Sequence, residues 1–372
     1  MEPQRLIHRL FLSLWVLFLP FWDFGAGAAL VLAFAAAVLN DLQNAGRKFR
    51  ESASFWPLWG LFGLVLLGTL WHGAALDSLL RMLPLLLLFW AFDRETIVRT
   101  LPLGASLLML YLLGGGLYRV WQGADWSVFV YRGLLEGLHQ HVYIGTYLLL
   151  AAVAVQISAF SARITALFWA ITLLFLGLLG AKMLLISALV AAIWWLYRSK
   201  SLPRWALPAA IFLVLGFVTA QGLSEGRALG HVFKPLDPYW ATGSVDTRAV
   251  QAKAALQASA EKPWLGWGPS EKQAALEQVY AEWNYRFGLK RHLNVHNQFL
   301  EWTLAYGLVG MALLVVVCTA AARNMPKRPW GLLILYFGSL WVTESFMERS
   351  LGVALFGLAW AWMASWVPPS EK

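Results

Sequence analysis

Residues 291–320, RHLNVHNQFLEWTLAYGLVGMALLVVVCTA, change abruptly from a polar segment to a long apolar run. The first seven residues contain one arginine, two histidines and two asparagines, and Glu301 follows as the chain becomes apolar. The run over 298–320 is long enough to cross a bilayer, since a membrane-spanning helix needs about 20 mainly apolar residues. The stretch therefore predicts a transmembrane helix that is entered from a polar segment.

The rest of the chain has the same apolar character. Of its 372 residues, 59% are hydrophobic and 13% are charged, whereas soluble domains are about 45–50% apolar and about 25% charged. A soluble globular protein is therefore excluded. Apolar runs predict an all-α, polytopic integral membrane protein with about twelve transmembrane helices, at 6–22, 26–40, 55–71, 79–92, 100–118, 141–158, 164–180, 183–197, 205–221, 298–320, 330–345 and 351–367.

The distribution of basic residues predicts the orientation. With the N-terminus inside, the inner segments hold 15 of the 29 Lys and Arg, the short outer segments hold 5, and one long outer loop holds 9. An excess of basic residues in short loops marks the cytoplasmic side, so both termini are predicted to be cytoplasmic. The first run lacks a small-residue cleavage site and is interpreted as an uncleaved span. The predicted organisation is 1–221 with helices 1–9, 222–296 as a periplasmic loop, and 297–372 with helices 10–12.

Two other features of the composition have simple interpretations. The net charge of +9 is explained by basic residues that flank spans, so no nucleic-acid partner is expected. The single cysteine, Cys318, excludes an internal disulfide framework.

The long loop is the one large polar region, and two helices are predicted in it. The first covers SVDTRAVQAKAALQASAEK, with Ser244 or Asp246 as its N-cap. The second follows Pro269 and Ser270, with Glu271 in its first turn. Between them, PWLGWG is predicted to be a turn with two aromatic anchors.

The polar segment before residue 298 is suited to binding an anion and moving a proton. A helix N-terminus offers unpaired N–H groups, and arginine can hold phosphate oxygens with two hydrogen bonds. A histidine among cations stays neutral, the state that a general base requires. The alternative is that these residues only cap the helix. A zinc site would need a third ligand besides the two histidines, so no metal and no cofactor are expected. The candidates are Arg248, Lys290, Arg291, His292, His296 and Asn297.

One motif in the stretch resembles a known family. His296 and Asn297 are followed by nine residues, Gly307, two residues and Gly310. This is similar to the His-[Asn/Ser/Gln]-x9-Gly-x-x-[Gly/Thr/Tyr] pattern of the O-antigen ligase and O-antigen polymerase superfamily. The order of elements also resembles that family, because Arg248 starts a loop helix that is followed by PWLGWG. A GT-C-like membrane glycosyltransferase is therefore implied.

The resemblance implies further site residues. Lys182 stands where the family has an arginine at an outer helix start, and a plain topological role for this lysine stays open. The family's acidic residue in the last outer loop corresponds to Glu344 or Glu348, with pairing of Glu348 to Arg349 as the alternative. His141 and Tyr143, in HQHVYIGTYL, are similar to the His-rich entry to the sixth span.

The implied function is an O-antigen ligase of lipopolysaccharide biosynthesis in the bacterial inner membrane. It would transfer a glycan from undecaprenyl diphosphate to a hydroxyl of a lipid-linked sugar acceptor, lipid A–core, with inversion and without a metal. A surface polysaccharide polymerase and a protein O-oligosaccharyltransferase of the same superfamily are alternatives. A polysaccharide or lipid transporter or flippase is the alternative of another class, but no half-repeat is visible and few charges lie within spans.

Overall fold

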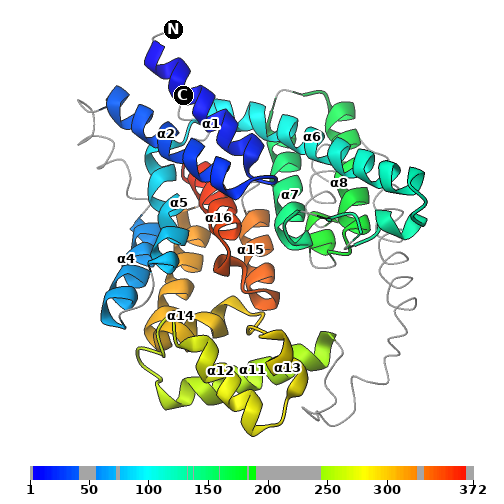
Figure 1. Ribbon diagram of the computed structural model, residues 1–372. Coiled ribbons are helices and arrows are strands. Elements are labelled where there is room, and N and C mark those ends of the chain that lie inside the picture. The colour runs from blue at the N-terminus through cyan, green and yellow to red at the C-terminus, as the bar shows by residue number, and fades with distance from the viewer. Residues whose placement is uncertain are drawn as a thin grey trace. The chain divides into compact units, whose positions relative to one another are not determined.

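The computed structural model describes residues 3–41, 56–72, 76–131, 133–136, 138–158, 160–181, 184–189, 244–324 and 331–365. These residues form helices joined by turns, and there is no strand among them (Figure 1). The expected all-α class is confirmed. The apolar helices are α1 (Pro3–Phe18), α2 (Asp23–Asp41), α4 (Trp56–Trp71), α5 (Asp77–Ala91), α6 (Arg94–Trp121), α7 (His141–Ile157), α8 (Ala162–Leu178), α14 (Gln298–Asn324), α15 (Gly331–Thr343) and α16 (Ser350–Ala364).

These helices lie where the apolar runs predicted spans. Within the part of the chain that the structure describes, three segments are both long and apolar enough to cross a membrane, namely Asp23–Asn40, Arg94–Trp121 and Gln298–Ala320. Four shorter helices are also apolar: Trp56–His72, His141–Ile157, Ala162–Leu178 and Ser350–Ala364. The predicted eighth span is described only at residues 184–189, where it is helical, and the predicted ninth span lies outside the described residues. The total of twelve spans stays a prediction.

The chain packs as two compact units, and each takes segments from distant parts of the sequence. The first comprises Met1–Ala53, Leu87–Ala220 and Ala354–Lys372, and the second comprises Ser54–Leu86 and Gln221–Val353. This division follows packing rather than chain order. The predicted boundaries at residues 221 and 296 describe the membrane topology, so they stay predictions.

In the first unit, α1 packs against α2 and α6, and α7 lies between α6 and α8. The α7 side chains from Val142 to Val155 are buried, as expected for a helix that is apolar on all sides. Tyr147 of α7 donates its hydroxyl hydrogen to the carbonyl of Val16 at 2.9 Å. Gly104 of α6 leaves room for that hydroxyl, because a Cβ at Gly104 would overlap it. A glycine of α6 and a buried phenol of α7 therefore allow close packing of α1, α6 and α7 at this point.

In the second unit, three loop helices pack in series, and the first of them packs against α14. They are α11 (Ser244–Glu261), α12 (Lys272–Glu282) and α13 (Arg286–Arg291), and Figure 1 shows them gathered together. The first two helices were predicted and the third was not. Glu271 occupies the N-cap position of α12 rather than its first turn, and α11 begins at Ser244, whose side chain lies outside the described ones. Their shared apolar core is made by Val250, Ala254, Ala258, Leu276, Val279, Tyr280, Tyr285, Val295 and Leu304.

The predicted PWLGWG turn packs into a break in α14. Gly307 has φ 64° and ψ −160°, so the helix is interrupted there. The amide of Leu308 donates to the carbonyl of Pro263 at 2.8 Å, and the amide of Gly268 donates to the carbonyl of Ala305 at 2.9 Å. Backbone groups that the break removes from the helix thus find partners in the turn, as apolar surroundings require. The motif glycine therefore docks the loop onto the span.

Candidate functional site

The polar segment of the quoted stretch is not helical. Residues 292–297 connect α13 to α14, and both His292 and His296 have positive φ, 48° and 51°. Such backbone conformations are uncommon for residues other than glycine and cluster at functional sites. Asn297 caps α14 as expected, since its Oδ1 accepts a hydrogen bond from the amide of Leu300 at 3.0 Å. The two histidines are therefore not one helical turn apart, and a shared metal site at helical spacing is not formed by this segment.

Glu344 joins the two principal candidates. It lies immediately after α15. One of its carboxylate oxygens is 3.0 Å from Nδ1 of His296, and the other accepts a hydrogen bond from Nη2 of Arg248 at 3.0 Å. The side chain of Glu344 is only 19% exposed, against 33% for His296 and 43% for Arg248. A half-buried carboxylate thus links a histidine and an arginine that face solvent more openly.

This contact determines which nitrogen of His296 can act as a base. A carboxylate only accepts hydrogen bonds, so Nδ1 of His296 carries the ring proton and donates a hydrogen bond to Glu344. In the neutral ring, Nε2 then has the lone pair. A carboxylate in this position also stabilises the imidazolium that forms when Nε2 takes a proton, as in triads of histidine and acid. The arrangement is therefore suited to general-base chemistry at Nε2.

A second charged cluster is more deeply buried. Nζ of Lys272 lies 2.6 Å from Glu301 and 2.7 Å from Glu348, and Glu348 also pairs with Arg81 at 3.0 Å. Lys272 and Glu301 are 11% and 3% exposed in their side chains. The partners of Glu348 in this cluster are thus Lys272 and Arg81, instead of the neighbouring Arg349 that was the alternative from the sequence. The members of this cluster come from segments that the distribution of Lys and Arg predicts to lie at the outer side of the membrane.

Glu301 connects this buried cluster to the first one. Its Oε2 accepts hydrogen bonds from the amide of Val295 at 3.3 Å and from the hydroxyl of Ser345 at 3.0 Å. Val295 directly precedes His296, and Ser345 directly follows Glu344. One buried carboxylate therefore fixes the backbone beside both members of the His296–Glu344 pair. In the same region, Gln298 accepts a hydrogen bond from the amide of Met347 at 2.6 Å.

The ion pairs keep the buried groups charged. Burial raises the pKa of Glu348, but the nearby charges of Lys272 and Arg81 outweigh it and the pKa is lowered. Burial likewise lowers the pKa of Lys272, but Glu301 and Glu348 outweigh it and the pKa is raised. Both shifts have the direction that opposite charges at hydrogen-bonding distance produce. Lys272 and Glu348 thus favour their charged forms in each other's presence.

Three other predicted residues, Lys290, Arg291 and His292, are exposed on the second unit. The side chain of His292 is 76% exposed, and its Nδ1 lies 3.0 Å from the carboxylate of Glu277. Burial raises the pKa of Glu277, but hydrogen bonds from Gln273 and His292 outweigh it, so that this pKa is lowered. Lys290 is exposed, and Arg291 lies over the ring of Phe287 at 4.9 Å. Their roles, like those of His141 and Tyr143 in the first unit and of Lys182 outside the described residues, stay predictions.

Three members of the buried cluster were missed by the sequence reasoning: Lys272, Glu301 and Arg81. Glu301 had a usable signal, since an ionisable residue at the start of a transmembrane run is costly and usually functional. Lys272 had none, because a lysine in a polar loop helix looks like a solvated surface residue. Only the fold of the loop onto α14 buries it.

Comparison with known proteins agrees with the resemblance seen in the motif. Residues 164–315 match the family described as O-Antigen ligase. The matched segment includes Arg248, His296, Gly307 and Gly310, and it ends before Glu344. No curated protein matches the chain.

Proposed function

We propose that the chain, whose residues 164–315 match the O-antigen ligase family, is a membrane glycosyltransferase that acts as an O-antigen ligase. The donor is a glycan on undecaprenyl diphosphate, and the acceptor is a hydroxyl of lipid A–core. Transfer takes place at the periplasmic side of the bacterial inner membrane. A lipid diphosphate is a sensible donor there, because its leaving group supplies the energy without a nucleotide sugar.

The proposed reaction is one displacement at the anomeric carbon. Nε2 of His296 takes the proton from the acceptor hydroxyl, and that oxygen forms the new bond to the anomeric carbon. The bond from this carbon to the diphosphate oxygen breaks, and the electron pair leaves with the phosphate. Because the acceptor attacks opposite the leaving group, the configuration inverts. Arg248 supplies positive charge to the leaving diphosphate, so the step requires no metal ion.

The single observation that carries the proposal is the position of Glu344 between His296 and Arg248. A base and a phosphate-binding cation must lie close together, because the bond that forms and the bond that breaks share one carbon. Their common carboxylate holds the two side chains in one place and orients the imidazole for proton transfer. If His296 and Asn297 only capped α14, no arginine from another helix would be required beside them.

The test is glycan transfer by the purified full chain with a defined undecaprenyl diphosphate donor. Lipid A–core and a second undecaprenyl-linked repeat are offered as separate acceptors, in buffer with and without EDTA. The expected result is a new glycosidic bond to lipid A–core that forms in EDTA and is lost in Arg248→Ala. Transfer only to the lipid-linked repeat would make the chain a polymerase, and the absence of any new bond from a folded protein would overturn the proposal.

The arginine also permits a sharper control. Arg248→Lys keeps the charge but loses the planar fork that binds two phosphate oxygens, so we expect an activity between those of the wild type and Arg248→Ala. Lys253→Ala, on the same helix α11, serves as the matched control and should retain transfer. Equal loss in Lys253→Ala and Arg248→Ala would indicate damage to α11 instead of a loss of phosphate binding.

A further inference from the structure

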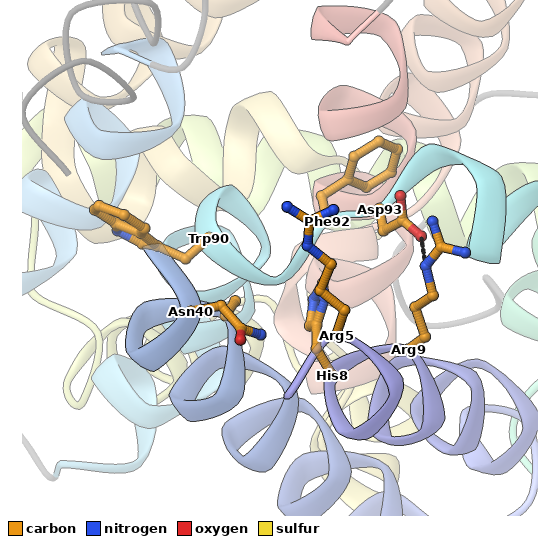
Figure 2. A pocket seen from close by; sticks show the side chains of 8 residues that line it. Arg5, His8, Arg9, Asn40, Trp90, Phe92 and Asp93 are labelled. Atoms are coloured by element: carbon orange, nitrogen blue, oxygen red, sulfur yellow. Dashed lines mark ion pairs between the residues drawn. The ribbon is translucent and has the colours of Figure 1, made fainter. Parts of the chain in front are cut away.

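Two features outside the proposed site attract attention, and the first is a polar pocket of about 270 Å³ in the first unit (Figure 2). Its charges are already paired. Nε of Arg9 lies 3.3 Å from Asp93 and Nη2 lies 2.9 Å from Glu95, and Arg5 also has an interaction partner. The charges of these four side chains sum to zero, so they favour neither an anion nor a cation.

The second feature is the tip of the PWLGWG turn, residues 263–265, in the second unit. The side chains of Trp264 and Leu265 are 69% and 54% exposed, although the loop that carries them is predicted to lie in water. Single apolar residues are normal on a water-facing surface. Here the exposed apolar surface continues onto α14, because Leu308 and Val309, next to the tip, are exposed as well.

Hydrogen bonds attach the tip to α14 at one level of the helix. The carbonyl of Pro263 accepts from the amide of Leu308 at 2.8 Å, and the carbonyl of Trp264 accepts from the amide of Val309 at 3.5 Å. At Gly307 a Cβ would overlap the carbonyl group of Trp264. The tip therefore lies directly against the span just after its break.

This level gives the depth of the tip in the membrane. The segment Gln298–Ala320 is long and apolar enough to span a bilayer, and the distribution of Lys and Arg places Arg323, just beyond it, at the cytoplasmic boundary. A straight helix over residues 308–322 rises only about 22 Å, whereas the hydrocarbon core is about 30 Å thick. The core should therefore extend about 8 Å beyond Leu308 toward the outer side. Interfacial apolar side chains typically enter the membrane by about 5–10 Å, which is the same depth.

We propose that residues 263–265 form a membrane anchor, in which the side chains of Trp264 and Leu265 lie among the phospholipid acyl chains of the leaflet opposite Arg323. This leaflet is the outer one in the predicted orientation. The anchor holds the end of α11 and the start of α12 at the membrane surface, because the tip lies between these two helices in the chain. It does not depend on the proposed reaction.

The backbone of the turn suits this position. Polar backbone groups inside a bilayer must be paired within the protein. Besides the two carbonyls that accept hydrogen bonds from α14, the amide of Gly266 donates to the carbonyl of Lys262 at 3.1 Å, and the amide of Trp267 donates to the carbonyl of Leu304 at 2.9 Å. Pro263 has no N–H to satisfy. The turn thus binds to protein through its backbone while its two apolar side chains at the tip face outward.

The neighbouring side chains suit the boundary between acyl chains and head groups. Lys262, which precedes the tip, places its Nζ over the ring of Trp267 at 4.0 Å, and a lysine can lay its apolar stem along lipid while its charge stays at the head groups. Trp71, at the end of α4, is 77% exposed. Its neighbour His72 contacts the same turn, since a Cβ at Gly268 would overlap the imidazole. Tryptophan is enriched at this boundary.

The experiment measures the depth of a spin label on the full chain in phosphatidylcholine vesicles. Cys318→Ser removes the single native cysteine, and Leu265→Cys then carries the label. Collisions with oxygen, which concentrates among acyl chains, are compared with collisions with a nickel chelate, which stays in water. The matched controls are Ala281→Cys, exposed on α12, and Val315→Cys, exposed within α14.

We expect the ratio of oxygen to nickel collisions at position 265 to exceed the ratio at position 281 several-fold and to approach the ratio at position 315. A ratio equal to that at position 281 would place the tip in water and overturn the proposal. Low collision rates with both reagents would show that protein, such as a second copy of the chain, covers the tip, which would also overturn it.

A second measurement needs no substitution at the tip. The wild-type chain is irradiated in phosphatidylcholine vesicles whose acyl chains carry a photoactivatable diazirine, and the lipid adducts are located by mass spectrometry. Adducts are expected on residues 263–265 as well as on the exposed residues of α14. Adducts on α14 without any at the tip would contradict the anchor, even if Leu265→Cys fails to fold.

Discussion

Lys272 and Glu301 form a buried ion pair, with Nζ and Oε1 2.6 Å apart. The lysine comes from a loop helix, α12, and the glutamate from the first turn of an apolar span, α14. Glu301 in turn accepts hydrogen bonds from backbone and side chain next to His296 and Glu344. The pair therefore connects the folding of the loop to the geometry of the proposed site.

We expect Lys272→Ala to destabilise the protein strongly. Removal of one partner leaves two buried carboxylates with less positive charge, and a broken buried pair typically costs about 3–5 kcal/mol. Lys253→Ala is the control, because Lys253 is an exposed lysine of α11 and surface substitutions usually change stability by no more than about 0.5 kcal/mol. Thermal unfolding of both variants in the same detergent measures the difference. Equal melting temperatures would show that the buried pair adds nothing to stability.

His296→Ala should reduce glycan transfer by about 10²–10⁴-fold, the usual contribution of a positioned general base. Donor binding should largely survive, because the diphosphate is held by cations. His292→Ala is the matched comparison, since His292 is exposed and contacts Glu277 instead of Glu344. Turnover and donor affinity are measured side by side. Loss of turnover in His292→Ala alone would assign the base to the other histidine.

Glu344→Gln is expected to reduce the turnover number more than it changes the apparent affinity for the donor. An amide can donate to Nδ1 of His296 and so place the ring proton on Nε2, which then cannot act as a base. Glu344→Asp keeps the charge and should recover part of the activity. The split between turnover number and donor affinity distinguishes the roles, because loss of a purely structural glutamate should also weaken donor binding and lower the melting temperature, whereas loss of an orienting carboxylate should lower mainly the turnover number.

Gly307→Ala should disrupt the break in α14. The residue has φ 64°, where side chains are strained, and a Cβ there would overlap the backbone of Trp264. The turn that docks at this break would be displaced, so we expect a lower melting temperature and loss of transfer. Gly338→Ala is the control, because Gly338 lies within α15 and has open space where the new methyl group would lie. In a helix that change should be neutral or stabilising by about 0.5–1 kcal/mol.

The stability of the protein should fall at acidic pH, and Glu348 should account for part of the loss. The pKa of Glu348 is lowered from 4.5, because Lys272 and Arg81 outweigh its burial. A lowered pKa contributes stability above the unfolded value, and that stability is lost as pH falls through the folded value. Melting temperatures are compared from pH 7 down to about pH 3. Glu348→Gln should have a lower melting temperature at pH 7 and should lose less of it over that range. Parallel curves for the variant and the wild type would show that Glu348 does not contribute to the acid sensitivity.

Local sequence patterns were sufficient to predict the described helices. Apolar runs long enough to span a bilayer have few other solutions, because every backbone group in lipid must be paired within a helix. The described helices accordingly lie where those runs predicted them, down to the cap that Asn297 makes at α14. Residue type favoured His296 and Arg248, because phosphate binding and proton transfer use few kinds of side chain, and the resemblance of their motifs to the ligase family singled them out. Their catalytic roles stay predictions.

The partners of these residues came only from the packing of distant segments. Glu344 lies 48 positions from His296 and 96 from Arg248, and the sequence could not choose between Glu344 and Glu348. Lys272 looks like a surface residue until the loop folds onto the broken span at Gly307. Burial and ion pairing depend on which distant segments come into contact, and a local sequence pattern does not contain that information. The chemistry of each side chain is thus a property of its type, whereas its partners and its protonation are properties of the fold.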